Sequence, residues 1–396
     1  MTECQDPAGA LAAGAVARFG GVRAARVVEC VDVLAEPEKI GAGGWWAVVG
    51  EFDGPVRAWR FAEVERLADD GPGSPDGGSQ DEGHGQVDSA TGASATSPRA
   101  TSWSGPTSDA WRSSMDRAAY EAAVVATRES IREGEVYQVN VCRVLSAALP
   151  RTPTGDEPDA RALADVLARG NPAPYAGYVH VPRGGAVPGV WVVSASPELY
   201  LRRSGERLES APIKGTARDE QGLQDKDRAE NVMITDLVRN DLQRVCAPGT
   251  VDVTSLLAIE HHPGLVHLVS TVAGELRPDV LTAPDAWGRI VSATYPPGSV
   301  SGAPKSSALR AIDRLEPVGR GPYCGAVGWI DADRGTAELA VAIRTFWWDD
   351  EDGGTLRFGT GAGITWGSDP AGEWHETELK ASRLVSIASQ RGDWGA

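Results

Sequence analysis

The sequence predicts an α+β protein built around large, mainly antiparallel sheets. Segments with strand-like composition outnumber the helical ones and do not alternate with them one for one, which disfavours a doubly wound parallel sheet. Helical spacing of apolar residues is confined to a few long stretches. The composition, 41% apolar and 23% charged, is that of an ordinary globular protein.

Strands are predicted where apolar, β-branched and aromatic residues gather between turn-forming residues. These segments are 45–49, 56–61, 136–149, 190–194, 199–202, 266–272, 323–330, 338–348 and 356–358. Helices are predicted where apolar residues recur every three or four positions. These segments are 118–133, 161–169, 225–246, 306–315 and 373–390.

Composition divides the chain into three parts. Residues 1–68 are rich in strand-forming residues and predict a β-rich N-terminal part of the fold. Residues 69–110 are dominated by Gly, Ser, Asp, Thr and Pro, which predicts a flexible, low-complexity insertion. Residues 111–396 carry nearly all of the candidate chemistry and form the predicted catalytic domain.

Charge and cysteine content exclude several classes of protein. The net charge of −17 argues against a broad nucleic-acid surface. No run of about 18 apolar residues is present, so no membrane span is expected. The five cysteines show neither CxxC pairs nor a disulfide framework, which is typical of a reducing compartment. We therefore expect a cytoplasmic protein that binds neither nucleic acid nor membrane.

Lys214 is unusual because the chain has five lysines against thirty-three arginines. Lysine can lose its proton and act as a nucleophile, whereas the guanidinium of arginine stays protonated. Lys214 lies in the run Ala211–Thr216, which reads as the end of a strand. A structural cation at this place is the alternative interpretation.

Two predicted helices each carry a pair of carboxylates on one face. Asp227 and Glu230 are three residues apart, as are Glu373 and Glu376, with Lys380 four residues further on. Two such helices can close around one hard divalent ion, and Mg²⁺ commonly takes one or two protein carboxylates. The alternative is that each pair is simply a solvated helix face.

Further candidate residues lie at strand ends and in small-residue loops. Gly359–Gly363 between a strand and a helix lets backbone amides approach an anion, although a plain turn has the same composition. Arg344 can grip a carboxylate with two hydrogen bonds. Glu198 can serve as a general acid if it is partly buried. His267, within an apolar strand, is either a core residue or a catalyst.

Eleven segments in a fixed order form one larger pattern, which covers roughly residues 115–390. The segments are 137–140 (YQVN), 196–198 (SPE), 212–216 (PIKGT), 227–231 (DRAEN), 236–242 (DLVRNDL), 267–270 (HLVS), 301–305 (SGAPK), 320–328 (RGPYCGAVG), 342–344 (AIR), 361–363 (GAG) and 373–377 (EWHET). Together they resemble the chorismate-utilising enzymes, the family of the anthranilate, aminodeoxychorismate, isochorismate and salicylate synthases.

The resemblance implies a sandwich of two large, mainly antiparallel sheets with outer helices, with the site between the sheets. It also implies Mg²⁺ as cofactor and chorismate as substrate. By the family pattern Glu230 and Glu376 hold Mg²⁺, with Asp227 and Glu373 close by. The predicted catalytic residues are Lys214, Glu198 and His267, of which Glu198 protonates the departing C4 hydroxyl. The predicted substrate contacts are Arg344, Tyr323, Gly361, Ala362, Gly363, Thr216, Ser299 and Lys380.

Two positions discriminate between reactions within the family. The family members that add water at C2 carry a lysine base at the position where this chain has Gln138. Anthranilate synthases carry Ala where Lys214 stands. A lysine at this position is similar to the aminodeoxychorismate synthases. The resemblance then implies that Lys214 attacks C2, that ammonia attacks C4, and that a glutamine amidotransferase subunit supplies the ammonia.

Two other functions stay open from the sequence. Anthranilate synthase is the alternative within the same class of enzyme. A non-catalytic regulatory subunit that binds chorismate or tryptophan is the alternative from another class, although every proposed chemical group is present. The product of aminodeoxychorismate synthesis serves p-aminobenzoate and folate, or an aromatic-amine secondary metabolite.

Overall fold

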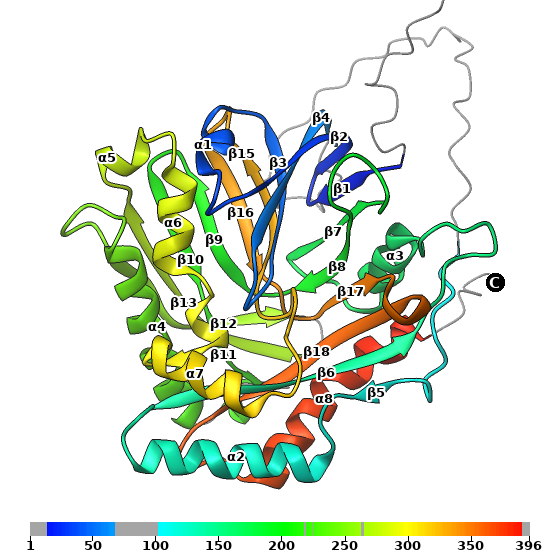
Figure 1. Ribbon diagram of the computed structural model, residues 1–396. Helices are drawn as coiled ribbons and strands as arrows, with labels where there is room; N and C mark the ends of the chain where they lie inside the picture. The colour runs from blue at the N-terminus through cyan, green and yellow to red at the C-terminus, as the bar shows by residue number, and fades with distance from the viewer. Residues whose placement is uncertain (1–13, 68–101, 218, 224, 263–264, 390–396) are drawn as a thin grey trace, which may run out of the picture.

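The computed structural model describes residues 14–67, 102–217, 219–223, 225–262 and 265–389. Its strands form one large curved sheet, and every strand pairing in it is antiparallel (Figure 1). The eighteen strands of this sheet are β1 (Val16–Phe19), β2 (Val22–Asp32), β3 (Trp45–Gly50), β4 (Val56–Arg66), β5 (Arg112–Ser113), β6 (Gln138–Ala148), β7 (Tyr175–Val181), β8 (Val190–Ser196), β9 (Leu199–Ser204), β10 (Arg207–Ala211), β11 (Ile213–Ala217), β12 (Asp252–His262), β13 (Leu265–Glu275), β14 (Gly302–Ala303), β15 (Ala326–Asp331), β16 (Thr336–Val341), β17 (Thr345–Asp349) and β18 (Thr355–Ile364).

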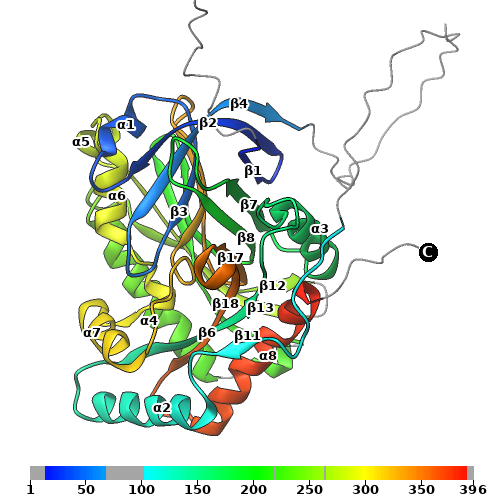
Figure 2. The ribbon, with the colours of Figure 1, turned by 45° about the vertical axis from the view of Figure 1, so that its right-hand side comes forward.

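Helices cover the outside of the sheet. The α-helices are α1 (Pro37–Gly41), α2 (Arg117–Arg132), α3 (Ala160–Gly170), α4 (Asp225–Gln243), α5 (Pro278–Leu281), α6 (Ala286–Thr294), α7 (Lys305–Leu315) and α8 (Pro370–Ala388). Short 3₁₀ turns are η2 (Glu220–Gly222), η3 (Gly298–Val300) and η4 (Glu351–Gly353). Figure 2 shows α2 and α8 together beneath β6 and β18, while α4 packs on β11 and β13.

The order of the strands brings the two ends of the sheet together. Hydrogen-bonded neighbours run β6–β18–β17–β8–β7–β1–β2–β4–β3–β15–β16–β9–β10–β13–β12, with β11 on the same edge of β13 as β10. Near one end Gln138 of β6, which also pairs with the short strands β5 and β14, and near the other end Lys214 of β11 both contact Glu230 of α4. The candidate site therefore lies where the ends of the sheet meet.

The predicted α+β class and antiparallel pairing are confirmed, with one refinement. Hydrogen bonds join all the described strands into a single network, so the expected pair of separate sheets is one continuous sheet. The N-terminal strands belong to it, because β1 pairs with β7 and β3 pairs with β15. The predicted insertion at 69–110 falls largely outside the described residues, which resume at 102.

Two strand predictions were wrong at the site itself. The single strand expected over 338–348 is two strands, β16 and β17, separated at residues 342–344, where Arg344 adopts a φ of 53°. The short strand 356–358 with a following glycine loop is instead one long strand, β18, which pairs with β6 as far as Ile364. Glycine is needed at these positions of β18 because neighbouring atoms lie so close to the backbone that a Cβ would clash with them.

Apolar side chains fill two clusters. The larger contains side chains of β3, β15 and β16 together with those of α4, α6 and α7. The smaller lies between α3, α8 and the strands β8, β17 and β18. Strand β3 is buried along its whole length, so its sequence reads as a continuous apolar run instead of an alternating one.

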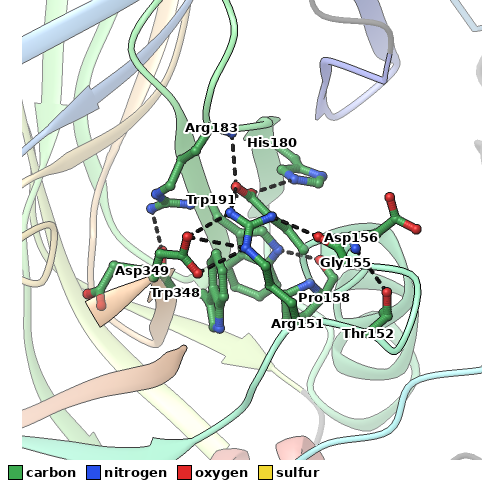
Figure 3. A network of polar contacts seen from close by, with 12 residues as sticks. Arg151, Thr152, Gly155, Asp156, Pro158, His180, Arg183, Trp191, Trp348 and Asp349 are labelled. Atoms are coloured by element: carbon green, nitrogen blue, oxygen red, sulfur yellow. Dashed lines mark hydrogen bonds and ion pairs between the residues drawn. The ribbon is translucent and has the colours of Figure 1, made fainter. Parts of the chain in front are cut away.

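A buried carboxylate fixes the loop that follows β6. Glu157 accepts hydrogen bonds from the backbone N–H of Arg183 at 2.9 Å and from the side chain of Arg151 at 3.3 Å, and His180 Nε2 lies 3.0 Å away. Both guanidinium groups also lie over the Trp348 ring, at 5.6 and 5.0 Å from its centroid (Figure 3). Burial opposes ionisation of Glu157, but His180 and Arg183 outweigh it and lower its pKa to about 2.

The Glu157→Gln variant is expected to lose about 3 kcal/mol of unfolding free energy at pH 7, because the half-buried guanidinium groups of Arg151 and Arg183 lose their buried counter-charge. The pKa of this carboxyl is lowered from 4.5 to about 2 on folding, so wild type keeps this stabilisation above pH 4.5 and loses it as the pH falls towards 2. Urea unfolding at several pH values measures both effects. Asp350→Asn, which removes the exposed partner of Arg151, is the control and should cost less than about 1 kcal/mol. Equal losses in the two variants would contradict the role of Glu157.

Candidate active site

The centre of the site is one carboxylate oxygen shared between two ends of the sheet. Lys214 Nζ on β11 lies 2.7 Å from Glu230 Oε1 on α4. The same oxygen accepts a hydrogen bond from Nε2 of Gln138, the first residue of β6. Gly363 of β18 lies directly beside this group, since a Cβ there would come within 2.6 Å of Glu230 Oε1 and 3.4 Å of Lys214 Nζ. Only glycine leaves room for three polar side chains to converge.

The helix that carries Glu230 is held in place by a buried amide. Asn231 is fully buried and donates from Nδ2 to the Leu268 carbonyl of β13 at 3.0 Å. Its Oδ1 accepts from the Ser270 hydroxyl, also on β13. These bonds fix the rotation of α4 about its axis and thereby the direction of Glu230. Asn231 has no role among the residues predicted from the sequence, although a polar residue on the packing face of a helix is a signal of such an anchor.

Glu198, between β8 and β9, is buried and has an unusual acidity. Burial raises the pKa of its carboxyl to about 7, although hydrogen bonds from Ser299 and the Ile213 amide oppose the rise. The charges of Lys214 and Arg344 oppose it as well. Within the described part of the chain, Glu198 Oε1 has no hydrogen-bond partner. A carboxyl that titrates near neutrality and has a free oxygen is suited to acid–base chemistry.

His267 and Thr216 are paired residues on the adjacent strands β13 and β11. His267 of β13 is buried, and its pairing partner in β11 is Thr216, two residues after Lys214. The register therefore places His267 next to the strand that carries the lysine. The side chain of Thr216 lies outside the described part of the structure.

Arg344 lies in a strained backbone between β16 and β17. Its φ of 53° is in the left-handed region, which costs a bulky residue on the order of 1 kcal/mol or more. The carbonyl of Arg344 accepts a hydrogen bond from the Ala195 amide at 3.0 Å, which ties this conformation to the end of β8. Burial lowers the pKa of the guanidinium, while the charge of Glu198 raises it. Such strain is typical of residues held for function.

The backbone of β18 presents amides towards the site. Beyond Phe358 this strand pairs with β6 alone, with Gly361 opposite Cys142 and Gly363 opposite Asn140. The Gly361 carbonyl accepts from Lys380 Nζ at 3.1 Å and so points away from β6. Because polar groups alternate along an antiparallel strand, the amides of Gly361 and Gly363 point the same way, while Ala362 bonds to β6. The Tyr323 ring packs directly on Gly359 of the same strand.

The second carboxylate pair lies on α8 among lysines. Lys380 Nζ is 2.6 Å from Glu376 Oε1. Burial alone would raise the pKa of Glu376, but the ammonium groups of Lys380, Lys226 and Lys214 outweigh it and lower the pKa. Burial raises the pKa of Glu373, and the charge of Glu376 adds to this rise. Lys226 was not among the predicted site residues.

Carboxylates are suitable ligands for a hard divalent cation, although the described ones are not gathered around a single position. Among the described residues no three His, Cys, Asp or Glu side chains are gathered closely enough to bind a metal. Glu230, Glu373 and Glu376 nevertheless all act on Lys380 electrostatically. Asp227 lies against Gly215, close to the strand of Lys214. Carboxylate oxygens are the donors that Mg²⁺ takes, and it needs only one or two carboxylates from the protein. Mg²⁺ at this place stays a prediction.

The structure thus brings together most of the predicted residues. Glu198, Lys214, Glu230, Arg344 and Gly363 form one connected group, and Lys380 links it to α8. Ser299 joins through its hydrogen bond to Glu198. The roles predicted for these residues stay predictions, since they concern bound substrate and metal.

The chain belongs to the chorismate binding enzyme family, whose model matches residues 75–386. It is 38% identical over 290 residues to an anthranilate synthase component 1 from Saccharolobus solfataricus, covering 70% of this chain and 64% of the relative. It is 36% identical over 289 residues to an aminodeoxychorismate synthase component 1 from Klebsiella aerogenes, covering 70% of this chain and 59% of the relative. The aligned region thus spans about three fifths of these relatives.

Solved structures share the fold. The anthranilate synthase component I of Streptococcus pneumoniae matches with a TM-score of 0.68 at 22% identity and covers 93% of this chain and 92% of that one. The menaquinone-specific isochorismate synthase of Escherichia coli matches with a TM-score of 0.70 at 18% identity and covers 98% and 92%. In the described residues no helix is both long and apolar enough to cross a bilayer.

The Gly363→Ala variant is expected to bind chorismate at least ten times more weakly, because its methyl group displaces Gln138 and Glu230 from their shared position. Calorimetric titration with chorismate and Mg²⁺ measures the affinity, and circular dichroism checks the fold. Gly367→Ala is the matched control, since nothing lies within 4 Å of a Cβ at that position. Wild-type affinity in folded Gly363→Ala would show that this convergence of side chains is not the binding site.

Proposed function

We propose that the protein is the synthase subunit of an aminodeoxychorismate synthase, which replaces the C4 hydroxyl of chorismate with an amino group. The observation that carries this proposal is the place of Lys214. Its amine lies 2.7 Å from Glu230 Oε1 and acts electrostatically on the buried acid Glu198. A primary amine between an acid and a candidate metal ligand is positioned for nucleophilic catalysis.

Binding of chorismate is assigned to two groups of residues. Glu230 and Glu376 would hold Mg²⁺, with Glu373 and Asp227 close by, and Mg²⁺ when bound supplies positive charge for the ring carboxylate. Arg344, Tyr323 and the amides of Gly361 and Gly363 bind the enolpyruvyl carboxylate. Arg344 contributes two donors in a fixed fork, and its strained backbone fixes the direction of that fork.

The reaction proceeds in two substitutions. Glu198 protonates the C4 hydroxyl, which leaves as water. Lys214, after its ammonium group has lost one proton to solvent, bonds to C2 as the neutral amine. Ammonia then bonds to C4, and the bond between C2 and Lys214 breaks with its electron pair returning to the lysine. His267 lies close to the departing hydroxyl. The two steps retain the diene and place the amino group at C4.

The ammonia is assigned to a partner subunit. A glutamine amidotransferase would release it by hydrolysis of glutamine, and free ammonium would substitute for the partner at high concentration. Support comes from the relatives, which are named as component 1 of their synthases.

Anthranilate synthase is the second candidate, because relatives with that name match this chain at 38% identity. In that reaction the amino group is placed at C2 and pyruvate is lost. The lysine at position 214 argues for the first candidate, since a nucleophile at C2 competes with ammonia for that carbon.

Purified protein with Mg²⁺, chorismate and ammonium is expected to give 4-amino-4-deoxychorismate, which yields p-aminobenzoate only after a lyase is added. Liquid chromatography with mass spectrometry identifies the product. Direct release of fluorescent anthranilate would contradict the assignment. Turnover of neither kind, with chorismate still bound, would favour a regulatory subunit.

Incubation without ammonia should add to the protein the mass of chorismate less one water, because Lys214 has no incoming amine to displace it. Intact-protein mass spectrometry detects this addition. Lys214→Ala should abolish it, whereas Lys39→Ala, which changes an exposed lysine paired with Glu36, should retain it. An adduct that persists in Lys214→Ala would assign the nucleophile to another residue.

The rate should fall as the pH rises above about 7, because Glu198 must be protonated to act as the acid and its pKa is raised to about 7. Initial rates at saturating chorismate between pH 5.5 and 9 give the profile. Glu198→Gln should lower kcat by at least about 100-fold and remove this limb. A wild-type profile that is flat from pH 6 to 9 would exclude Glu198 as the acid.

A further inference from the structure

A small pocket, with a cavity volume of about 20 Å³, adjoins Glu198. Its wall includes β9, the end of α4 and the η3 turn, and two candidate site residues, Glu198 and Ser299, line it. Lys214, Glu230 and Gly363 are not among the residues that line it. The pocket therefore adjoins the proposed active site on the side of the acid and not on the side of the metal carboxylates.

The wall of the pocket combines apolar side chains with hydrogen-bond acceptors. Val238 and Leu242 of α4 supply the apolar part, and the carboxylates of Glu198 and Asp241 are both buried or nearly so. None of the described lining residues is Lys or Arg. The pocket thus suits a small ligand that donates hydrogen bonds and carries positive or no charge.

One ammonium group already binds at the edge of this wall. Lys305 Nζ donates to Asp241 Oδ2 at 2.6 Å and to the Thr294 carbonyl at 2.9 Å. Asp241 and Thr294 both line the pocket, so its acceptors are placed where they can bind N–H groups. Glu198 Oε1, by contrast, has no hydrogen-bond partner within the described residues and is free for a ligand.

We propose that this pocket binds the nitrogen nucleophile, as ammonium or ammonia, and delivers it to Glu198. The inference rests on the proposed function. The hydroxyl that Glu198 protonates and the incoming amine bond to the same carbon, C4. Ammonia must therefore reach the place where Glu198 acts, and Glu198 itself lines this pocket.

The proton balance of the two substitutions closes at Glu198. The acid gives its proton to the C4 hydroxyl, which leaves as water. The resulting carboxylate takes a proton from ammonium in the pocket, which regenerates the acid and produces ammonia. Ammonia bonds to C4 through its lone pair, Lys214 leaves C2 as a neutral amine, and the product carries an ammonium group. No oxidant or further reactant is needed.

A substitution that makes the pocket narrower, and changes no charged group, tests the proposal. Val238→Met, which enlarges a side chain in the wall, should raise the KM for ammonium at least fivefold and leave the KM for chorismate within twofold of wild type. Val232→Met is the matched control, because Val232 lies on the same helix, is 46% exposed and does not line the pocket. It should keep both KM values. A wild-type ammonium KM in folded Val238→Met would overturn the proposal, as would an equal rise in both KM values.

A second variant decides the question if Val238→Met does not fold. Val238→Ala widens the pocket and should lower the KM for methylammonium at least threefold relative to the KM for ammonium. An unchanged ratio of the two values would overturn the proposal.

The outcomes separate this proposal from the function on which it rests. Anthranilate as the wild-type product would overturn the proposed function and with it the delivery of ammonia to C4, while a selective rise in the ammonium KM would still show that the pocket binds ammonium. Aminodeoxychorismate as the product, together with a wild-type ammonium KM in Val238→Met, would overturn the pocket alone.

Discussion

Glu230 Oε1 accepts contacts from Gln138 at one end of the sheet and from Lys214 at the other. An eighteen-stranded antiparallel sheet has ends that need not meet, and here one carboxylate on α4 joins them. The carboxylate can do so because Asn231, the next residue, is bonded to β13 and fixes the helix. The positions of Glu198, Arg344 and β18 relative to the lysine all depend on this closure, since each lies on a different strand or connection of the same sheet.

Carboxyl groups in the site fall into two electrostatic environments. Glu198 is buried with few countercharges, and its pKa is raised to about 7. Glu376 is surrounded by lysines, and its pKa is lowered. Two carboxyl groups whose pKa values are shifted in opposite directions can take different roles, one as a proton donor and the other as an anionic ligand. This difference in pKa depends on which residues lie next to each carboxyl group, because burial and neighbouring charge determine the pKa.

Close packing around the backbone of β18 and of Arg344 brings the site residues together and limits which residues these positions can hold. Gly359 contacts the Tyr323 ring, Gly361 contacts Cys142, and Gly363 contacts Glu230, all along one strand. Arg344 keeps a left-handed backbone in the connection between β16 and β17. Both features cost conformational free energy that a plain strand would not lose. The surrounding sheet, together with Trp348 of β17 and the Glu157 cluster packed on it, supplies the rigidity that maintains them.

The sequence by itself determined the fold class, most helices and strands, and the family, because periodicity and ordered motifs are local properties of the chain. It also identified Lys214, Glu198, Glu230 and Arg344 as candidates, since residue type limits chemistry. Only the tertiary structure decided that Gly359–Gly363 is a strand and that 338–348 breaks at Arg344, because contacts from β6 and β8 override local preference. The anchor of Asn231, the acidity of Glu198 and the pocket beside it likewise depend on residues far apart in the chain, and no pattern of spacing contains those distances.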